Sequence, residues 1–178
     1  MKVIFLDVDG VLIHNETLDG INLHIDEENV KILKEIVDKT DAKIVLSSSW
    51  RKEYNKDFPG KRNRYKVLEN ILNRNGLQIY DRTPVIKEKS LPYEHQEKYQ
   101  VINLSYDPKT TRAAEVKSYL ENHEEINSFL ILDDNNHEWD YFGYEDNWIK
   151  TDPNNGGLQK NHIDIAIEIL ETTKTKRR

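Results

Sequence analysis

Hydrophobic residues along the chain fall into short continuous runs that are separated by longer amphipathic segments. The strongest runs are rich in β-branched side chains and too short for helices, and they predict buried strands at 3–6, 42–46 and 129–132. Weaker runs predict two further strands at 77–80 and 148–149. In between, apolar residues recur at helical spacing and predict helices from the cap Asp26 to about Thr40, from Tyr65 to a stop at Gly76, and over 112–122 and 161–170.

This alternation of strands and helices predicts the fold class. A strand, a helix and a second strand within about fifty residues form a right-handed crossover unit of a parallel sheet. We therefore predict an α/β fold, a Rossmann-like parallel sheet flanked by helices, in a single domain over 1–178. The pair Asp19-Gly20 predicts a hairpin within 12–23 that forms a small flap.

The segment 83–111 departs from this pattern. Three prolines interrupt it and no strand or helix period is sustained, apart from a short apolar run at 101–104 that we interpret as a strand. A long stretch of this kind is usually functional or inserted. We interpret it as an inserted flap or lid near the site, and the basic tail 174–178 as frayed.

Composition narrows the class of protein. With 37% hydrophobic and 33% charged residues, no apolar run reaches membrane-spanning length, and we expect no membrane partner. The chain has no cysteine, which excludes disulfides and thiolate metal sites and fits a cytoplasmic protein. Because a core strand begins at residue 3, we expect no signal peptide. The net charge of −6 argues against a protein that coats nucleic acid with its whole surface, and no obligate protein partner is evident.

The first strand runs directly into Asp7 and Asp9. Residues two apart in an extended chain point to the same side, so the two carboxylates converge where the strand ends. Carboxylates this close repel each other unless a cation lies between them, and Gly10 lets the backbone turn just beyond them. The pair suits a carboxylate nucleophile, a neighbour that transfers protons, and a hard divalent cation. The alternative is a solvated Asp-x-Asp-Gly turn.

Two other predicted strands also end in polar side chains. The second strand is followed by Ser47-Ser48-Ser49, and the strand 129–132 is followed by Asp133-Asp134. Taken alone, the serines indicate a turn that caps a helix. The carboxyl ends of parallel strands share one edge of a sheet, which is where ligands bind in open α/β folds. Three such strand ends together therefore predict a functional site at that edge.

A locally basic segment lies between these motifs. Residues 51–66 contain seven basic and two acidic side chains, with aromatic residues interleaved. Such a segment is a candidate surface for a polyanion, or equally a basic helix face exposed to water. The candidate substrate-binding residues within it are Arg51, Lys61, Arg62 and Arg64.

The motifs resemble those of the haloacid dehalogenase (HAD) superfamily of phosphohydrolases across nearly the whole chain. The first family motif matches Phe5–Gly10, the second matches Leu46-Ser47, and the fourth matches Leu132–Asp134. The third family motif is a Lys or Arg on the helix before the last motif strand. In the subgroup that this chain resembles, a Gly follows that basic residue, whereas this chain has Arg112-Ala113. That subgroup comprises small phosphatase-like domains of bacteria and phages, also found fused to nucleic-acid repair proteins, and it resembles this chain further in 47–51 and 151–158.

The resemblance implies a role for each motif residue. Asp7 would attack phosphorus and form an aspartyl-phosphate, while Asp9 would protonate the leaving oxygen and later deprotonate water. Mg²⁺ would be held by the Asp7 carboxylate, the Asp9 backbone carbonyl and the acidic pair, with Asp134 the direct ligand and Asp133 in support. The phosphate would be bound by Ser47, Ser48 and Arg112, with Lys117 and Lys109 as alternatives to Arg112.

Three functions follow as hypotheses. The leading one is a magnesium-dependent phosphomonoesterase, whose phosphorylated substrate is left open among a small metabolite, a nucleotide and a nucleic-acid end. The second is a 3′-phosphatase on nucleic-acid ends, and the third is a non-catalytic HAD-like binding module. The short interval between Asp9 and Ser47 leaves no room for a large cap, which favours access by macromolecular substrates.

Overall fold

The computed structural model describes residues 1–15, 18–19, 22–56, 62–86 and 111–172. Its centre is a five-stranded sheet in which every neighbouring pair is parallel, in the order β5-β4-β1-β6-β7. The strands are β1 Lys2–Leu6, β4 Lys43–Leu46, β5 Ile79–Arg82, β6 Ser128–Asp133 and β7 Trp148–Lys150. The predicted α/β fold with a Rossmann-like parallel sheet is therefore confirmed.

Strand β5 starts two residues later than the predicted run 77–80. The backbone N–H of Leu77 donates to the Leu72 carbonyl at 2.9 Å, so Leu77 still completes the end of the preceding helix. Gly76 takes the left-handed conformation that this helix end requires, with φ 71°. Strand pairing begins only after the chain has left that turn.

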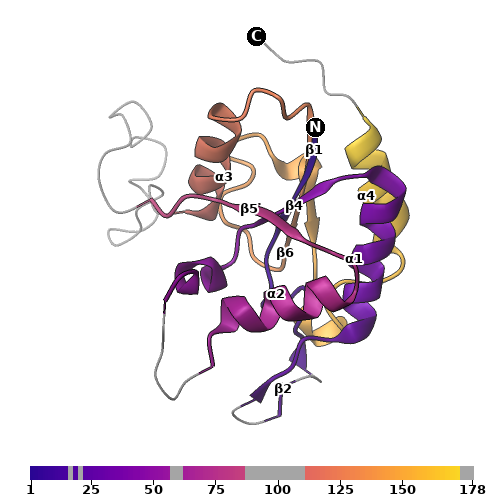
Figure 1. Ribbon diagram of the computed structural model, residues 1–178. Coiled ribbons are helices and arrows are strands. Elements are labelled where there is room, and N and C mark those ends of the chain that lie inside the picture. The colour runs from indigo at the N-terminus through magenta and orange to yellow at the C-terminus, as the bar shows by residue number, and fades with distance from the viewer. Residues whose placement is uncertain (16–17, 20–21, 57–61, 87–110, 173–178) are drawn as a thin grey trace, which may run out of the picture.

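Four helices flank the sheet: α1 Glu27–Thr40, α2 Arg64–Arg74, α3 Arg112–Glu121 and α4 His162–Glu171. As predicted, Asp26 caps α1, because its side chain accepts from the backbone N–H groups of Glu28 and Asn29. Figure 1 shows α1 and α4 side by side on one side of the sheet and α3 on the other. None of the described helices is long and apolar enough to cross a membrane.

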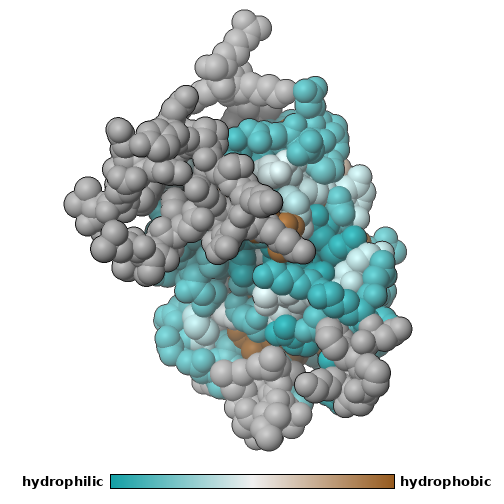
Figure 2. All heavy atoms as spheres, turned by 90° about the vertical axis from the view of Figure 1, so that its left-hand side faces the viewer, coloured by the Kyte–Doolittle hydropathy of each residue, from teal (hydrophilic) through white to brown (hydrophobic). Residues whose placement is uncertain are grey.

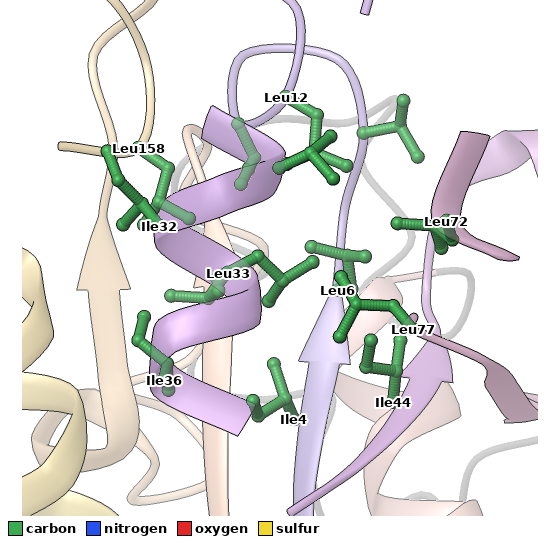
Figure 3. Close-up of a cluster of buried hydrophobic side chains, with 14 of the residues drawn as sticks. Ile4, Leu6, Leu12, Ile32, Leu33, Ile36, Ile44, Leu72, Leu77 and Leu158 are labelled. Carbon is green, nitrogen blue, oxygen red and sulfur yellow. The ribbon is translucent and has the colours of Figure 1, made fainter. Parts of the chain in front are cut away.

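The sheet separates two hydrophobic clusters. In the larger cluster, Leu33 and Ile36 of α1 pack against Ile4 and Leu6 of β1 (Figure 3). The smaller one joins alternate strand residues, such as Phe5, to α3. Because side chains alternate along a strand, the residue that follows Leu6 continues the α3 side of the sheet.

The strand register brings the polar residues at the carboxyl ends of the strands to one level. Leu6 pairs with Leu46 on one side and with Leu132 on the other. Backbone hydrogen bonds extend this level by one residue: Asp7 donates to Leu132, Ser47 to Leu6 and Thr83 to Leu46, at 2.8–3.1 Å. Asp133, Asp7, Ser47 and Thr83 therefore form one row across four strands at the carboxyl edge of the sheet.

The predicted hairpin is present beyond that edge. Strands β2 Leu18–Asp19 and β3 Asn22–Leu23 pair in antiparallel fashion, and Figure 1 shows them past the ends of the central strands. Of the predicted lid 83–111, the structure describes only 83–86 and Thr111. The predicted strand 101–104 and the basic tail 174–178 lie outside the described residues. On the α3 side in Figure 2, the described surface is mainly hydrophilic, with small hydrophobic patches.

Candidate active site

The loop after β1 brings Asp7 and the acidic pair together. Asp7 is only 4% exposed, and its Oδ1 accepts from the backbone N–H of Val8 at 2.8 Å. Gly10 has φ 77°, and a Cβ at this position would lie 2.3 Å from Cγ of Asp134. Only glycine allows the Asp134 carboxylate to approach the loop so closely. The Thr151 hydroxyl holds the turn by donating to the Gly10 carbonyl at 2.8 Å.

A second layer of contacts supports the same loop. The side-chain amide of Asn29 in α1 donates to the carbonyls of Val11 at 3.0 Å and Gly156 at 2.8 Å. The backbone N–H of Leu158 also donates to Val11 at 2.9 Å, and a Cβ on Gly157 would lie 2.5 Å from that carbonyl oxygen. The late segment 151–158, noted above for its resemblance to the subgroup, therefore braces the aspartate loop.

Three carboxylates converge around one guanidinium. Oxygens of Asp7, Asp133 and Asp134 lie within 4.8 Å of one another. Nη1 of Arg112, the first residue of α3, lies 2.5 Å from Oδ2 of Asp7 and 2.6 Å from Oδ2 of Asp133. Three basic residues were considered for the third motif, and the structure places Arg112 beside the acids. Lys117 instead pairs with Glu121 on the exposed part of α3, and Lys109 lies outside the described residues.

Burial first, and then the crowding of acids, perturbs the ionisation of this cluster. Burial raises the pKa of Asp7 to about 6; Arg112 opposes that rise and Asp133 adds to it. Burial, and then the charge of Asp133, also raises the pKa of Asp134. Burial alone would lower the pKa of Arg112, but Asp7 and Asp133 more than compensate and raise it. One guanidinium therefore offsets the repulsion only in part, and an all-oxygen site of this kind fits a hard divalent cation.

Asp9 lies apart from this cluster and has a different partner. Its Oδ2 accepts from the indole Nε1 of Trp50 at 3.0 Å. Trp50 belongs to the 3₁₀ helix Ser49–Glu53 (η2), which follows β4. The Ser48 hydroxyl, just before η2, accepts from the backbone N–H of Trp50 at 3.4 Å, and it lowers the pKa of Asp7 slightly against the effect of burial. The turn after β4 thus contacts Asp9 through Trp50 and influences the ionisation of Asp7 through Ser48.

Two buried hydroxyls in the row of strand ends have no hydrogen-bond partner among the described residues. They belong to Ser47, which is 2% exposed, and to Thr83, which is 3% exposed. A buried hydroxyl without a partner is unfavourable, so these groups are suited to a bound ligand. Ser47 was predicted for the phosphate. Thr83 was missed because β5 was predicted to end at residue 80; with the observed end at Arg82, Thr83 is the next polar residue.

The structure corrects the prediction that Arg51 lies on a substrate-binding basic surface. Arg51 is buried in an ion pair with Glu115 of α3, and it also donates to the carbonyls of Ser48 at 2.6 Å and Thr83 at 3.2 Å. A guanidinium this fully paired belongs to the interior. Its guanidinium joins the turn after β4, the end of β5 and α3, and the local basic composition does not indicate these contacts.

The remaining basic candidates lie elsewhere. Arg62 is exposed, and Lys61 lies outside the described residues. Arg64 pairs with Glu53 at 2.5 Å, and its guanidinium lies 5.5 Å from the centroid of the Trp50 ring. The structure therefore brings Arg64, but not Arg51, to an accessible position beside the turn that contacts Asp9.

The central strand of this parallel sheet ends in Asp-x-Asp-Gly, and adjoining segments supply a hydroxyl, a cation and paired acids. This combination defines a domain of the HAD superfamily. The family model described as the HAD domain in Swiss Army Knife RNA repair proteins matches residues 3–163. The chain belongs to this family, which supports a phosphohydrolase-type function and confirms the resemblance found in the sequence. Neither the comparison with curated proteins nor that with solved structures finds a significant match.

Proposed function

We propose that this chain is a magnesium-dependent phosphomonoesterase that acts through an aspartyl-phosphate on Asp7. The observation that carries the proposal is the convergence of the buried Asp7 with Arg112, Asp133 and Asp134. Beside them lies the Ser47 hydroxyl, which has no hydrogen-bond partner in the part of the chain that the structure describes. Each group has a use in phosphoryl transfer, and together they supply a nucleophile, a cation, a metal-binding set and a donor to the phosphate.

The chemistry proceeds in two balanced steps. A carboxylate oxygen of Asp7 attacks phosphorus while the bond from phosphorus to the leaving oxygen breaks, and Asp9 gives that oxygen its proton. Asp9, now a carboxylate, then takes a proton from water as the water oxygen attacks the aspartyl-phosphate. Inorganic phosphate leaves, Asp7 is regenerated as a carboxylate, and Asp9 again carries a proton. Ser47 and Arg112 donate hydrogen bonds to the phosphoryl oxygens.

The donor set around Asp7 fits Mg²⁺, which prefers oxygen ligands. Both oxygens of Asp133 are engaged, Oδ2 by Arg112 and Oδ1 by the backbone N–H of Asn135 at 3.0 Å. The oxygens of Asp7 are engaged in the same way, by the backbone N–H of Val8 and by Arg112, so these contacts do not by themselves separate the two residues. Following the family resemblance, we assign Asp7, Asp134 and the Asp9 backbone carbonyl as the residues that would hold the ion, with Asp133 in support. Mg²⁺ bound there would offset the repulsion between the anionic nucleophile and the anionic phosphate.

A second, narrower candidate is a 3′-phosphatase on nucleic-acid ends. The family description, which refers to RNA repair proteins, favours it. A cationic and aromatic surface near η2 also favours it: Tyr54 is 38% exposed, and the guanidinium of Arg82 lies 3.5 Å from the centroid of its ring. Stacked aromatic and guanidinium groups of this kind bind unpaired bases and backbone phosphates.

An assay with an aryl phosphate and Mg²⁺ tests the leading proposal. We expect hydrolysis that a chelator abolishes and that Asp7→Asn removes while the fold is retained. Undiminished activity without divalent ions, or normal turnover in Asp7→Asn, would exclude the mechanism. An inactive but folded wild-type protein would favour the non-catalytic binding module. A panel of nucleotides, sugar phosphates and 3′-phosphorylated oligonucleotides then distinguishes the substrate classes by kcat/KM.

A further inference from the structure

We propose that Trp50 is a positioning residue that holds Asp9 ready for proton transfer, an inference that rests on the proposed phosphatase function. Its indole Nε1 donates to Oδ2 of Asp9 at 3.0 Å. An indole has a single donor and no acceptor, so this contact has one direction and does not change with protonation of the ring. None of the four HAD motifs described above includes a tryptophan.

Trp50 is itself held on several sides, which qualifies it to orient a neighbour. It is 2% exposed and belongs to the larger hydrophobic cluster. Its backbone N–H donates to the Ser48 hydroxyl, and the guanidinium of Arg64 lies over its ring. Glu53 holds Arg64 through an ion pair, and it also accepts from the backbone N–H of Arg64 at 2.7 Å. The position of the indole is therefore set by packing before any substrate arrives.

The contact selects which oxygen of Asp9 handles the proton. With Oδ2 held by the indole, Oδ1 is the oxygen that remains for the leaving group and later for water. An aspartate without this restraint can rotate its carboxylate, and misplaced groups lose much of the benefit of general acid catalysis.

A positioning role predicts a dependence on the leaving group. Proton donation matters most when the leaving oxygen is strongly basic, as in an alkyl phosphate, and least for a nitrophenyl phosphate. We expect Trp50→Phe to lower kcat/KM for an alkyl phosphate by about 10- to 100-fold, part of the 10²–10⁴ that general acid catalysis supplies. For nitrophenyl phosphate the loss should be below about 3-fold. Because kcat/KM reports the first irreversible step, slow breakdown of the aspartyl-phosphate does not hide the difference.

Trp139→Phe is the matched control. Trp139 is also fully buried, and its indole donates to a backbone carbonyl, that of Asn135, at 3.0 Å. Its replacement removes the same atoms from the interior without touching Asp9, so any loss of activity should be similar for both substrates. An equal loss for both substrates in Trp50→Phe, or no loss for either, would overturn the proposal.

A nuclear magnetic resonance measurement keeps the proposal testable if Trp50→Phe does not fold. The chain has three tryptophans, and Asp9→Ala should move the indole N–H resonance of one of them while leaving the other two in place. Three unmoved resonances would overturn the contact itself. The two failures are distinguishable: a wild-type protein that hydrolyses neither phosphate refutes the proposed function, whereas an active enzyme without the leaving-group effect refutes only the role of Trp50.

Discussion

Replacing Asp7 by Asn should remove the proposed nucleophile and at the same time stabilise the metal-free fold. The pKa of Asp7 rises from 3.8 to about 6 in the folded protein, chiefly because the carboxyl is buried. At pH 8 the ionised carboxylate therefore lowers the free energy of unfolding by about 3 kcal/mol, at about 1.4 kcal/mol for each pKa unit. Asn has no charge to bury and keeps an acceptor oxygen for Arg112. The pKa of about 6 already includes the attraction to Arg112, so we expect a gain of up to about 3 kcal/mol.

The pH dependence separates this effect from a change in packing. Between pH 4 and 6 the folded state binds the Asp7 proton more tightly than the unfolded state does, so the contribution of Asp7 to wild-type stability falls as pH rises through this window. Asn at this position does not titrate. The difference in unfolding free energy between Asp7→Asn and wild type should therefore be near zero at pH 3.5, grow through pH 6, and stay constant above about pH 7.

Urea unfolding in a chelator, from pH 3.5 to 8, measures this difference. Replacement of the exposed Asp140 by Asn serves as the control and should change stability little at any pH. A gain that is independent of pH, or a loss of stability at pH 8, would refute the electrostatic reasoning. Adding Mg²⁺ should then stabilise wild type more than Asp7→Asn and narrow the gap, because an ion that binds only the folded state raises its stability by mass action.

Two further predictions concern the turn beside Asp7 and the basic segment. Gly10→Ala should abolish aryl phosphatase activity and destabilise the fold by more than about 3 kcal/mol in urea unfolding, because the added Cβ would overlap Asp134 and the backbone would also be strained. The control is Gly143→Ala, at a position with φ 69° and open space around it, which should cost only about 1 kcal/mol of unfolding free energy. Equal losses of stability in the two variants would contradict this reasoning. Replacing Lys61, Arg62 and Arg64 together by Gln should weaken hydrolysis of a 3′-phosphorylated oligonucleotide, most clearly at low salt, but barely change that of an aryl phosphate. The double variant at Lys61 and Arg62 keeps Arg64 over Trp50, so it separates a loss of oligonucleotide binding from damage to the turn after β4. Unchanged oligonucleotide kinetics in both variants would mean that the segment is only a solvated basic face.

Much of the fold and of the candidate site is predictable from local sequence. A buried parallel strand must be apolar throughout, so β1, β4 and β6 are visible as short hydrophobic runs. The carboxyl ends of such strands meet at one edge, and polar residues that directly follow them must therefore come together. Asp7, Ser47 and Asp133 do lie in one row for this reason. The helix starting at Arg112 was predicted as well, and α3 indeed begins there.

The tertiary structure alone decided which side chains meet across distant segments. Arg51 stands in a basic run, yet its burial depends on Glu115, which lies 64 positions later on a helix that packs over the same strand ends. Trp50 meets Asp9 only because β4 and β1 are adjacent and in register. Thr83 joins the row because β5 extends to Arg82, which pairs with Leu46 after a shift in register. Hydrophobic patterning is a local property that reports burial and element type. Register and long-range side-chain pairing depend on how the elements pack, so they emerge only when the whole chain is folded.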